Sequence, residues 1–192
     1  MRFEWVRAMT PAIHRAVFLD RDGVLNQVVL RAGRPYPPAS LAELVLLPGV
    51  REACQALRAG GFQLVMVTNQ PDVGRGTQTR EAVDAINDHL RHDLALDAVQ
   101  VCLHDDGDHC ACRKPKPGML TSAAQELGID LSRSFLVGDR WRDIEAGQRA
   151  GVRTIWIDCQ YQEQPPARPG HTVQNLAQAA DWILKLAKNS TG

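Results

Sequence analysis

Short apolar runs rich in β-branched residues alternate with amphipathic helical patterns along this chain. The runs predict five buried strands, at residues 16–19, 63–68, 98–103, 134–138 and 153–158. Apolar residues at helical spacing predict helices near residues 50–57, 83–94, 120–127 and 175–187. This alternation indicates an α/β fold with a parallel sheet and helices on both faces. Sites in such folds form beyond the carboxyl ends of the strands.

The punctuation between these elements agrees with the alternation. Thr79 stands where it can cap a helix start, and Gly128 and Gly151 lie just past predicted helix ends. Two segments show neither period, residues 26–47 and the Gln- and Pro-rich residues 159–171. We predict that both are exposed loops.

Length and charge restrict the class of protein. A chain of 192 residues suits one compact domain, which we expect to span residues 1–192 with residues 1–14 as an N-terminal extension. Lys plus Arg equals Asp plus Glu at 22 each, so no net charge favours nucleic acid or a membrane surface as a partner. The charged start of the chain is not a signal peptide, and no apolar run has the length of a membrane span. We therefore expect a soluble, cytoplasmic protein, most simply a monomer.

Polar residues follow three of the predicted strands. Asp20 and Asp22 come directly after the first strand, and Thr68 and Asn69 end the second. Asp139 follows the fourth strand. Each alone has a plain structural explanation, since an aspartate after a strand can begin a turn or cap a helix. Together, however, the strand ends of a parallel sheet would bring them to one crevice, where clustered carboxylates suit Mg²⁺.

The ordered segments FLDRDGVLN, VTNQ, RKPKPG and VGDRWRD resemble the motifs of the haloacid dehalogenase superfamily of Mg²⁺-dependent phosphotransferases. The resemblance implies a three-layer Rossmann-like fold, without a separate cap domain here because no long insertion interrupts the motifs. It also implies that Asp20 is the nucleophile that forms an aspartyl phosphate and that Asp22 is the acid and base. Mg²⁺ would be held by Asp20, the backbone carbonyl of Asp22 and Asp139, with Asp143 in support.

The same resemblance assigns groups that stabilise the phosphoryl oxygens. Thr68, with Asn69 beside it, would donate hydrogen bonds to them. Phosphoryl transfer also needs a positive charge near the transferring oxygens. Lys114 is the best match, and Lys116 is the alternative if the loop folds differently.

The segment VCLHDDGDHCACRKPKPGM places four metal-ligand side chains close together: Cys102, His104, Cys110 and Cys112. Three of the five cysteines fall within eleven residues, which does not resemble a secreted disulfide framework. Thiolates and an imidazole in a four-ligand set suit a structural, tetrahedral Zn²⁺. The alternative is that Cys102 is a buried strand residue and the others are merely exposed. His109 is a competing ligand. We expect the aspartates of the loop to have no functional role.

The C-x-H…C-x-C loop followed by RKPKPGM resembles, more narrowly, the family of heptose 1,7-bisphosphate 7-phosphatases and histidinol-phosphate phosphatases. In that family zinc orders the loop, and the resemblance implies substrate contacts by Asn26, Asn69, Arg113 and Arg140. The final PGM favours a small heptose bisphosphate as substrate, with histidinol phosphate as the alternative. A nucleic-acid 3′-phosphatase and a non-catalytic zinc module are further rivals.

This chain departs from the narrower family at two places. It reads QVVLRAGRPYPP where a His-Gly-Tyr segment is typical, and Pro71 and Asp72 follow VTNQ where small residues are usual. These loops would touch the distal part of a substrate. The expected substrate is therefore less well specified than the expected chemistry.

Overall fold

The computed structural model describes residues 13–31 and 34–189, and every structural statement below concerns these residues. The predicted N-terminal extension lies mostly outside them. Its last residue, His14, forms a bridge with Ile129 and donates its backbone N–H to the Gly128 carbonyl at 2.9 Å.

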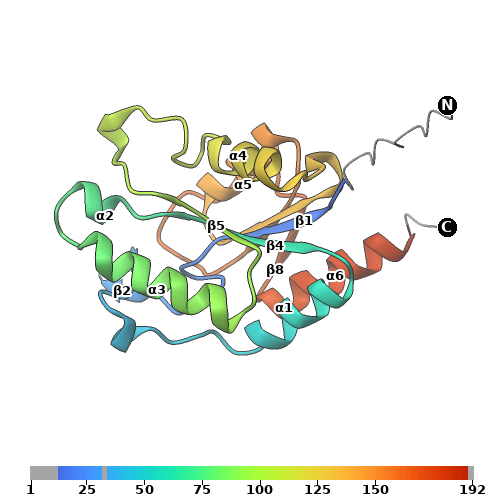
Figure 1. Ribbon diagram of the computed structural model, residues 1–192, viewed down its shortest axis with the longest axis horizontal. Helices are drawn as coiled ribbons and strands as arrows, with labels where there is room; N and C mark the ends of the chain where they lie inside the picture. Colours follow the sequence, from blue (N-terminus) through green and yellow to red (C-terminus); the bar gives the residue numbers. More distant parts are fainter. Residues whose placement is uncertain (1–12, 32–33, 190–192) are drawn as a thin grey trace, which may run out of the picture.

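The central sheet has parallel strands in the spatial order β5-β4-β1-β6-β7-β8 (Figure 1). The strands are β1 (Ala16–Leu19), β4 (Gln63–Asn69), β5 (Ala98–Cys102), β6 (Phe135–Gly138), β7 (Arg153–Ile157) and β8 (His171–Val173). β1 lies between β4 and β6, so the chain leaves it in one direction and later returns to its other side. Such a reversal opens a crevice at the carboxyl ends of the strands.

Helices cover both faces of the sheet, which confirms the predicted three-layer α/β fold (Figure 1). One face carries α1 (Val50–Ala59), α3 (Arg80–Asp93) and α6 (Leu176–Asn189), and the other carries α4 (Gly118–Leu127) and α5 (Trp141–Ala150). Successive residues of a strand point to opposite faces. Accordingly, Val17 and Leu19 pack into the first layer and Ala16 and Phe18 into the second.

The cap positions predicted at Thr79, Gly128 and Gly151 are confirmed. The Thr79 hydroxyl accepts a hydrogen bond from the Ala82 N–H at 3.2 Å at the start of α3. Gly128 and Gly151 end α4 and α5 in the left-handed conformation, with φ of 64° and 78°.

The segment 26–47 lies mostly at the surface, as predicted, but the prediction that it is only a loop is wrong. It contains an antiparallel hairpin of β2 (Val29–Arg31) and β3 (Arg34–Tyr36) and a 3₁₀ turn, η1 (Leu41–Glu43). Strands of three residues are too short to show a hydrophobic period. Asn26, at the start of this segment, is completely buried.

The segment 159–171 is largely irregular, as predicted, but it is not uniformly exposed. Tyr161 and Glu163 are half-buried, and its last residue begins β8, a strand that the sequence did not predict. Farther on, Gln148 of α5 donates to the carbonyls of Ala167 and Arg168. The Gly170 N–H donates to the Thr154 hydroxyl of β7 at 3.2 Å.

The segments between the strands contain no second domain within the described residues. The hairpin and η1 precede α1, and only α2 (Pro71–Gly74) and α3 lie between β4 and β5. This agrees with the expected absence of a cap domain. Among residues 13–31 and 34–189, no helix has both the length and the apolar character that crossing a membrane requires.

Candidate active site

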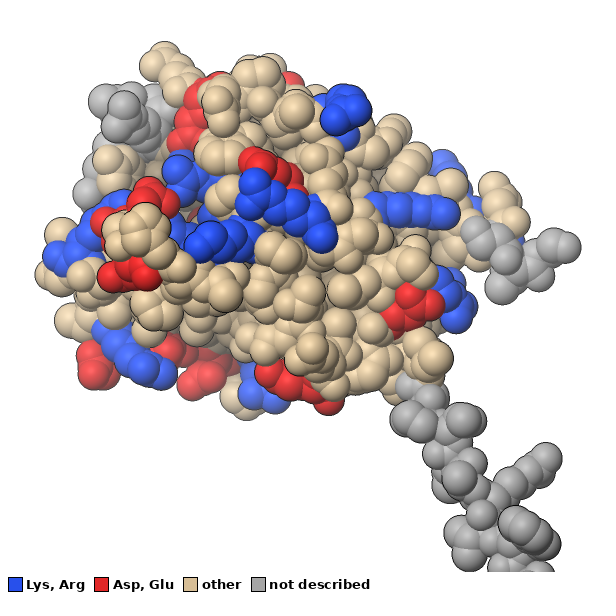
Figure 2. All heavy atoms as spheres, turned by 90° about the horizontal axis from the view of Figure 1, so that it is seen from above, with Lys and Arg blue, Asp and Glu red and all other residues tan. Residues whose placement is uncertain are grey.

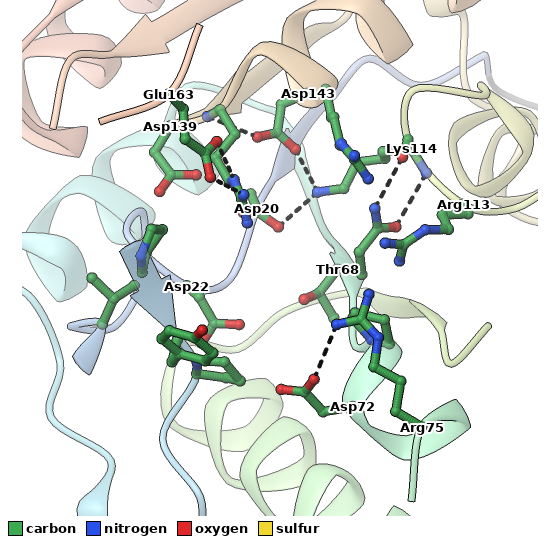
Figure 3. A pocket seen from close by; sticks show the side chains of 18 of the residues that line it. Asp20, Asp22, Thr68, Asp72, Arg75, Arg113, Lys114, Asp139, Asp143 and Glu163 are labelled. Atoms are coloured by element: carbon green, nitrogen blue, oxygen red, sulfur yellow. Dashed lines mark hydrogen bonds and ion pairs between the residues drawn. The ribbon is translucent and has the colours of Figure 1, made fainter. Parts of the chain in front are cut away.

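Neighbouring strands deliver polar side chains to one cavity of about 350 Å³. Asp20 follows β1, Thr68 and Asn69 end β4, and Asp139 follows β6 (Figure 3). β4, β1 and β6 are adjacent and parallel, so their carboxyl ends meet at one edge of the sheet. Asp22 and Lys114 also line this cavity.

A buried lysine joins two of the carboxylates. The Lys114 ammonium donates to Asp20 Oδ1 at 2.7 Å and lies 2.5 Å from Asp143 Oδ1 (Figure 3). It also donates to the Val67 carbonyl at 2.8 Å. Burial alone would lower the pKa of Lys114, but the charges of Asp143 and Asp20 outweigh it and raise the pKa above its ordinary value. Lys114 therefore keeps a positive charge beside Asp20. Lys116, the alternative, donates instead to carbonyls of the cysteine loop.

Asp20 is a carboxylate in an unfavourable place for its charge. Burial raises its pKa to about 6; Lys114 opposes that rise, whereas Asp143 and Asp22 add to it. One tenth of its side chain remains exposed, toward the cavity. The group is thus partly desolvated, close to a fixed cation and accessible, as a nucleophile must be.

Asp22 is held by donors on several sides. The side chain of Arg21 is completely buried, and its Nε lies 3.2 Å from both carboxylate oxygens of Asp22. Its Nη1 donates a hydrogen bond to Asn87 Oδ1 at 2.9 Å. Asn26 donates to Asp22 Oδ1 at 3.0 Å, and Gln70 donates to Oδ2 at 2.7 Å. These bonds fix the orientation of Asp22 at the wall of the cavity.

The structure changes the roles expected of the two asparagines. Asn26 is completely buried, does not line the cavity and uses its amide to hold Asp22 and the Gln27 carbonyl, so a direct substrate contact does not fit its position. Asn69 lines the cavity, but its amide exchanges two hydrogen bonds of 3.1 Å with the Lys114 backbone. Both side chains position a neighbouring functional group.

Thr68 lies at the end of β4 with its side chain nearly buried. Its Oγ1 accepts a hydrogen bond from Gln70 at 2.8 Å. An accepting hydroxyl keeps its own hydrogen to donate. Thr68 can therefore donate to an anionic oxygen in the cavity.

Three buried carboxylates could hold a divalent cation: Asp20, Asp139 and Asp143 each offer an oxygen, all within 4.8 Å of one another. Both Asp139 oxygens are buried without a hydrogen bond of acceptable geometry. Burial first, and then the charges of Asp20 and Asp143, raise the pKa of Asp139 well above its usual range. A cation would relieve this repulsion, and an oxygen ligand set suits Mg²⁺. The Asp22 carboxylate lies outside this group, so its backbone carbonyl as a ligand stays a prediction.

The cysteine loop brings its four predicted ligand atoms together. The three Sγ–Sγ distances are 3.7, 3.3 and 3.5 Å, and His104 Nδ1 lies 3.7 and 3.3 Å from the sulfurs of Cys102 and Cys112. A tetrahedral zinc ion with Zn–S bonds of about 2.3 Å separates two sulfur ligands by about 3.8 Å. The donor set and its spacing therefore fit zinc. His109, the competing ligand, is not part of this group of four.

The prediction that the aspartates of the loop have no role is wrong. Asp106 accepts from Arg113 at 2.7 Å and from Arg142 at 3.2 Å. Asp105 accepts two bonds from Arg75, at 2.9 and 2.6 Å. All three arginines line the cavity. We call these five residues the Arg–Asp ladder; it connects α2, the cysteine loop and the start of α5.

Arg140 also lines the cavity, on the side of β6. Its Nε donates to Glu163 Oε2 at 3.0 Å, and its Nη2 contacts the other oxygen of the same carboxylate. The guanidinium is thus bound to a residue of the irregular segment after β7. A contact between Arg140 and a substrate stays a prediction.

Sequence reasoning missed several residues that shape the site. Arg21 and Gln70 stand inside the quoted motifs, yet nothing in the sequence shows that they hold Asp22. Arg75 and Arg142 are ordinary surface residues until the fold places them at the cavity. Glu163 comes from a segment without any periodic signal.

Comparisons with known proteins agree with the motifs. Residues 28–151 match the family of haloacid dehalogenase-like hydrolases. A D-glycero-beta-D-manno-heptose-1,7-bisphosphate 7-phosphatase of Helicobacter pylori is 33% identical over 88% of this chain and 97% of its own length. The enzyme of the same name from Yersinia pestis is 35% identical over 88% and 89%.

A solved structure gives the same picture. The D,D-heptose 1,7-bisphosphate phosphatase of B. bronchiseptica, complexed with magnesium and phosphate, superimposes with a TM-score of 0.77 at 30% identity. The match covers 90% of this chain and 99% of that one.

Proposed function

Because the chain belongs to the haloacid dehalogenase-like hydrolases, we propose that it removes the 7-phosphate of D-glycero-D-manno-heptose 1,7-bisphosphate through an aspartyl-phosphate intermediate. The observation that carries the proposal is the pairing of an accessible Asp20 with the buried Lys114, beside an Asp22 held by three donors. This arrangement separates a nucleophile from an acid within one cavity.

The residues can divide the reaction between them. Asp20 attacks the phosphorus, and the bond from phosphorus to the sugar oxygen breaks as Asp22 gives that oxygen a proton. Asp22 then takes a proton from water, whose oxygen attacks the aspartyl phosphate, so that inorganic phosphate leaves and Asp20 is restored. Lys114 and Thr68 stabilise the charge on the phosphoryl oxygens throughout.

Two metal ions fit the ligand groups of this chain. Mg²⁺ would be held by Asp20 and Asp139, with Asp143 beside them, and would neutralise charge at the phosphoryl group. Zn²⁺ would be held by Cys102, His104, Cys110 and Cys112. The zinc loop leads directly into Arg113 and Lys114, so ordering the loop lowers the entropic cost of placing both side chains.

The cavity suits a small substrate with two phosphate groups. Its rim carries Arg75, Arg113 and Arg142. These residues are far from Asp20 in the sequence but line the same cavity. A second phosphate suits these guanidinium groups. The relatives named above act, by their names, on a heptose bisphosphate.

A nucleic-acid substrate fits the surface less well. Such a substrate needs a continuous basic groove along its backbone. Figure 2 shows basic and acidic side chains interleaved on the face seen there. Histidinol phosphate remains the alternative, with the same nucleophile and metal ions. We further propose a single-domain, cytoplasmic monomer, which fits a thiol cluster kept reduced.

Phosphate release from a substrate panel tests the proposal. The panel holds both heptose 1,7-bisphosphate anomers, histidinol phosphate and a 3′-phosphorylated oligonucleotide, with Mg²⁺ present. We expect the highest kcat/KM for a heptose bisphosphate and no turnover by Asp20→Asn. Preference for histidinol phosphate would replace the substrate and keep the chemistry. An active Asp20→Asn would contradict the aspartyl-phosphate mechanism, and metal analysis showing no zinc would contradict the loop assignment.

A further inference from the structure

Asp139 has its backbone fixed but its carboxylate unsupported by the motif residues. Trp156 Nε1 donates to the Asp139 carbonyl at 3.0 Å. Its carboxylate is buried, and within the described residues neither oxygen has a hydrogen bond of acceptable geometry. A metal ligand of this kind normally depends on an outer group to orient it.

The Tyr161 hydroxyl lies at the place where such a group is needed. A Cβ atom on Gly23 would be 2.1 Å from Asp139 Oδ2 and 2.8 Å from the Tyr161 hydroxyl oxygen. Gly23 has a φ of +86°, so only glycine suits it on both grounds. The carboxylate and the phenol therefore both border the small space that a Gly23 side chain would occupy.

Residues on either side of Tyr161 in the chain hold its segment in place. The Cys159 thiol lies 3.9 Å from the Gly23 carbonyl, and the Glu163 N–H donates to the Tyr161 carbonyl at 2.8 Å. Glu163 in turn binds Arg140, the neighbour of Asp139. The phenol is thus held against the motif by contacts that do not involve its own hydroxyl.

The chemistry of the pair suits a hydrogen bond from the phenol to the carboxylate. A phenol hydroxyl carries one hydrogen that it can donate, whereas an ionised carboxylate can only accept. Tyr161 can therefore act as the donor and Asp139 as the acceptor.

We propose that Tyr161 is a positioning residue that donates its hydroxyl hydrogen to Asp139 and so orients that carboxylate toward the divalent cation shared with Asp20. The inference rests on the proposed Mg²⁺-dependent function. Loss of an outer group of this kind lowers metal affinity by about 10- to 100-fold. A role in packing alone would leave the affinity of a phenylalanine variant unchanged.

Calorimetric titration of the full-length, zinc-loaded protein with Mg²⁺, in the absence of substrate, tests the inference. We expect Tyr161→Phe to bind Mg²⁺ at least about tenfold more weakly than wild type. The matched control is Gln164→Ala, in the same segment and exposed, which should bind as wild type does. The zinc content of Tyr161→Phe should stay at the wild-type value.

The outcomes separate the inference from the proposed function. Wild-type affinity in Tyr161→Phe overturns the inference and leaves the function standing. A wild-type protein that does not bind Mg²⁺ overturns both.

A measurement on the folded wild type covers the case in which Tyr161→Phe is unstable. The chain has two tyrosines, Tyr36 and Tyr161. We expect Mg²⁺ to perturb the tyrosine absorption of the wild type, because the cation draws charge from the carboxylate that the phenol donates to. The perturbation should persist in Tyr36→Phe, and its absence from that variant overturns the inference.

Discussion

Replacing Lys114 by methionine removes the positive charge from a buried cluster of carboxylates. In the wild type, Lys114 lies 2.7 Å from Asp20 and 2.5 Å from Asp143, and only 2% of the residue is exposed. Methionine fills most of the same volume, so the change tests charge rather than packing. Removing one partner of a buried ion pair lowers the free energy of unfolding by about 3–5 kcal/mol.

Two features of the structure place the loss toward the upper part of that range. Lys114 faces two carboxylates, and the Val67 carbonyl also loses its donor. A domain of this kind has a total stability of about 5–15 kcal/mol. We therefore expect a decrease in melting temperature of about 10 °C, since each kcal/mol corresponds to about 2–4 °C at this size.

Urea unfolding at pH 7 without Mg²⁺, followed by tryptophan fluorescence, measures this loss. Lys116→Met is the matched control, because Lys116 is exposed and contacts only loop carbonyls; its stability should change by less than about 1 kcal/mol. In a double-mutant cycle, Lys114→Met with Asp143→Asn should lose less than the sum of the single changes. A loss below about 1 kcal/mol for Lys114→Met, or strict additivity, would refute this reasoning.

Three further predictions follow from the same site. Asp20 has a pKa of about 6 in the folded protein, against 3.8 for an ordinary aspartate. The contribution of Asp20 to stability is therefore complete below pH 3.8 and is lost as the pH rises through about 6. Between pH 5 and 7 without Mg²⁺, the free energy of unfolding of the wild type, measured in urea, should fall by about 1 kcal/mol more than that of Asp20→Asn. An equal fall in both proteins would contradict the burial of the Asp20 charge. Gly138→Ala places a Cβ 2.2 Å from the Asp143 Cβ. We expect the free energy of unfolding to fall by about 1–3 kcal/mol and kcat to fall by about 100-fold. A wild-type kcat in steady-state assays would count against this contact. Cys112→Ser should purify with little zinc by metal analysis and with reduced activity, because the loop that positions Lys114 loses its metal; a full zinc content would exclude the proposed ligand set.

The sheet could be predicted from the sequence because its strands are buried on both faces. A buried parallel strand is a continuous apolar run, as Ala16–Leu19 and Phe135–Gly138 are. The three-residue strands β2, β3 and β8 were missed because so short a segment has no measurable period. Their places depend on tertiary contacts.

The positions of the site could be predicted better than the tasks of individual side chains. An amide such as Asn26 or Asn69 can bind a substrate or hold a neighbour, and the sequence does not show which. Asp105 and Asp106 looked like any exposed loop residues, because their arginine partners come from distant segments. Tyr161 lies in a segment whose path is set only by its packing against the fold.

The Arg–Asp ladder bears on how quickly the protein can turn over. Its arginines are already bound to aspartates before any anion arrives, so an entering phosphate exchanges one set of ion pairs for another. The net gain on binding is then small, and the returning aspartates help to displace the anion when it leaves. Under the proposed function, we expect the phosphate that stays on the sugar product to be held weakly at this rim, and that product to inhibit the enzyme little.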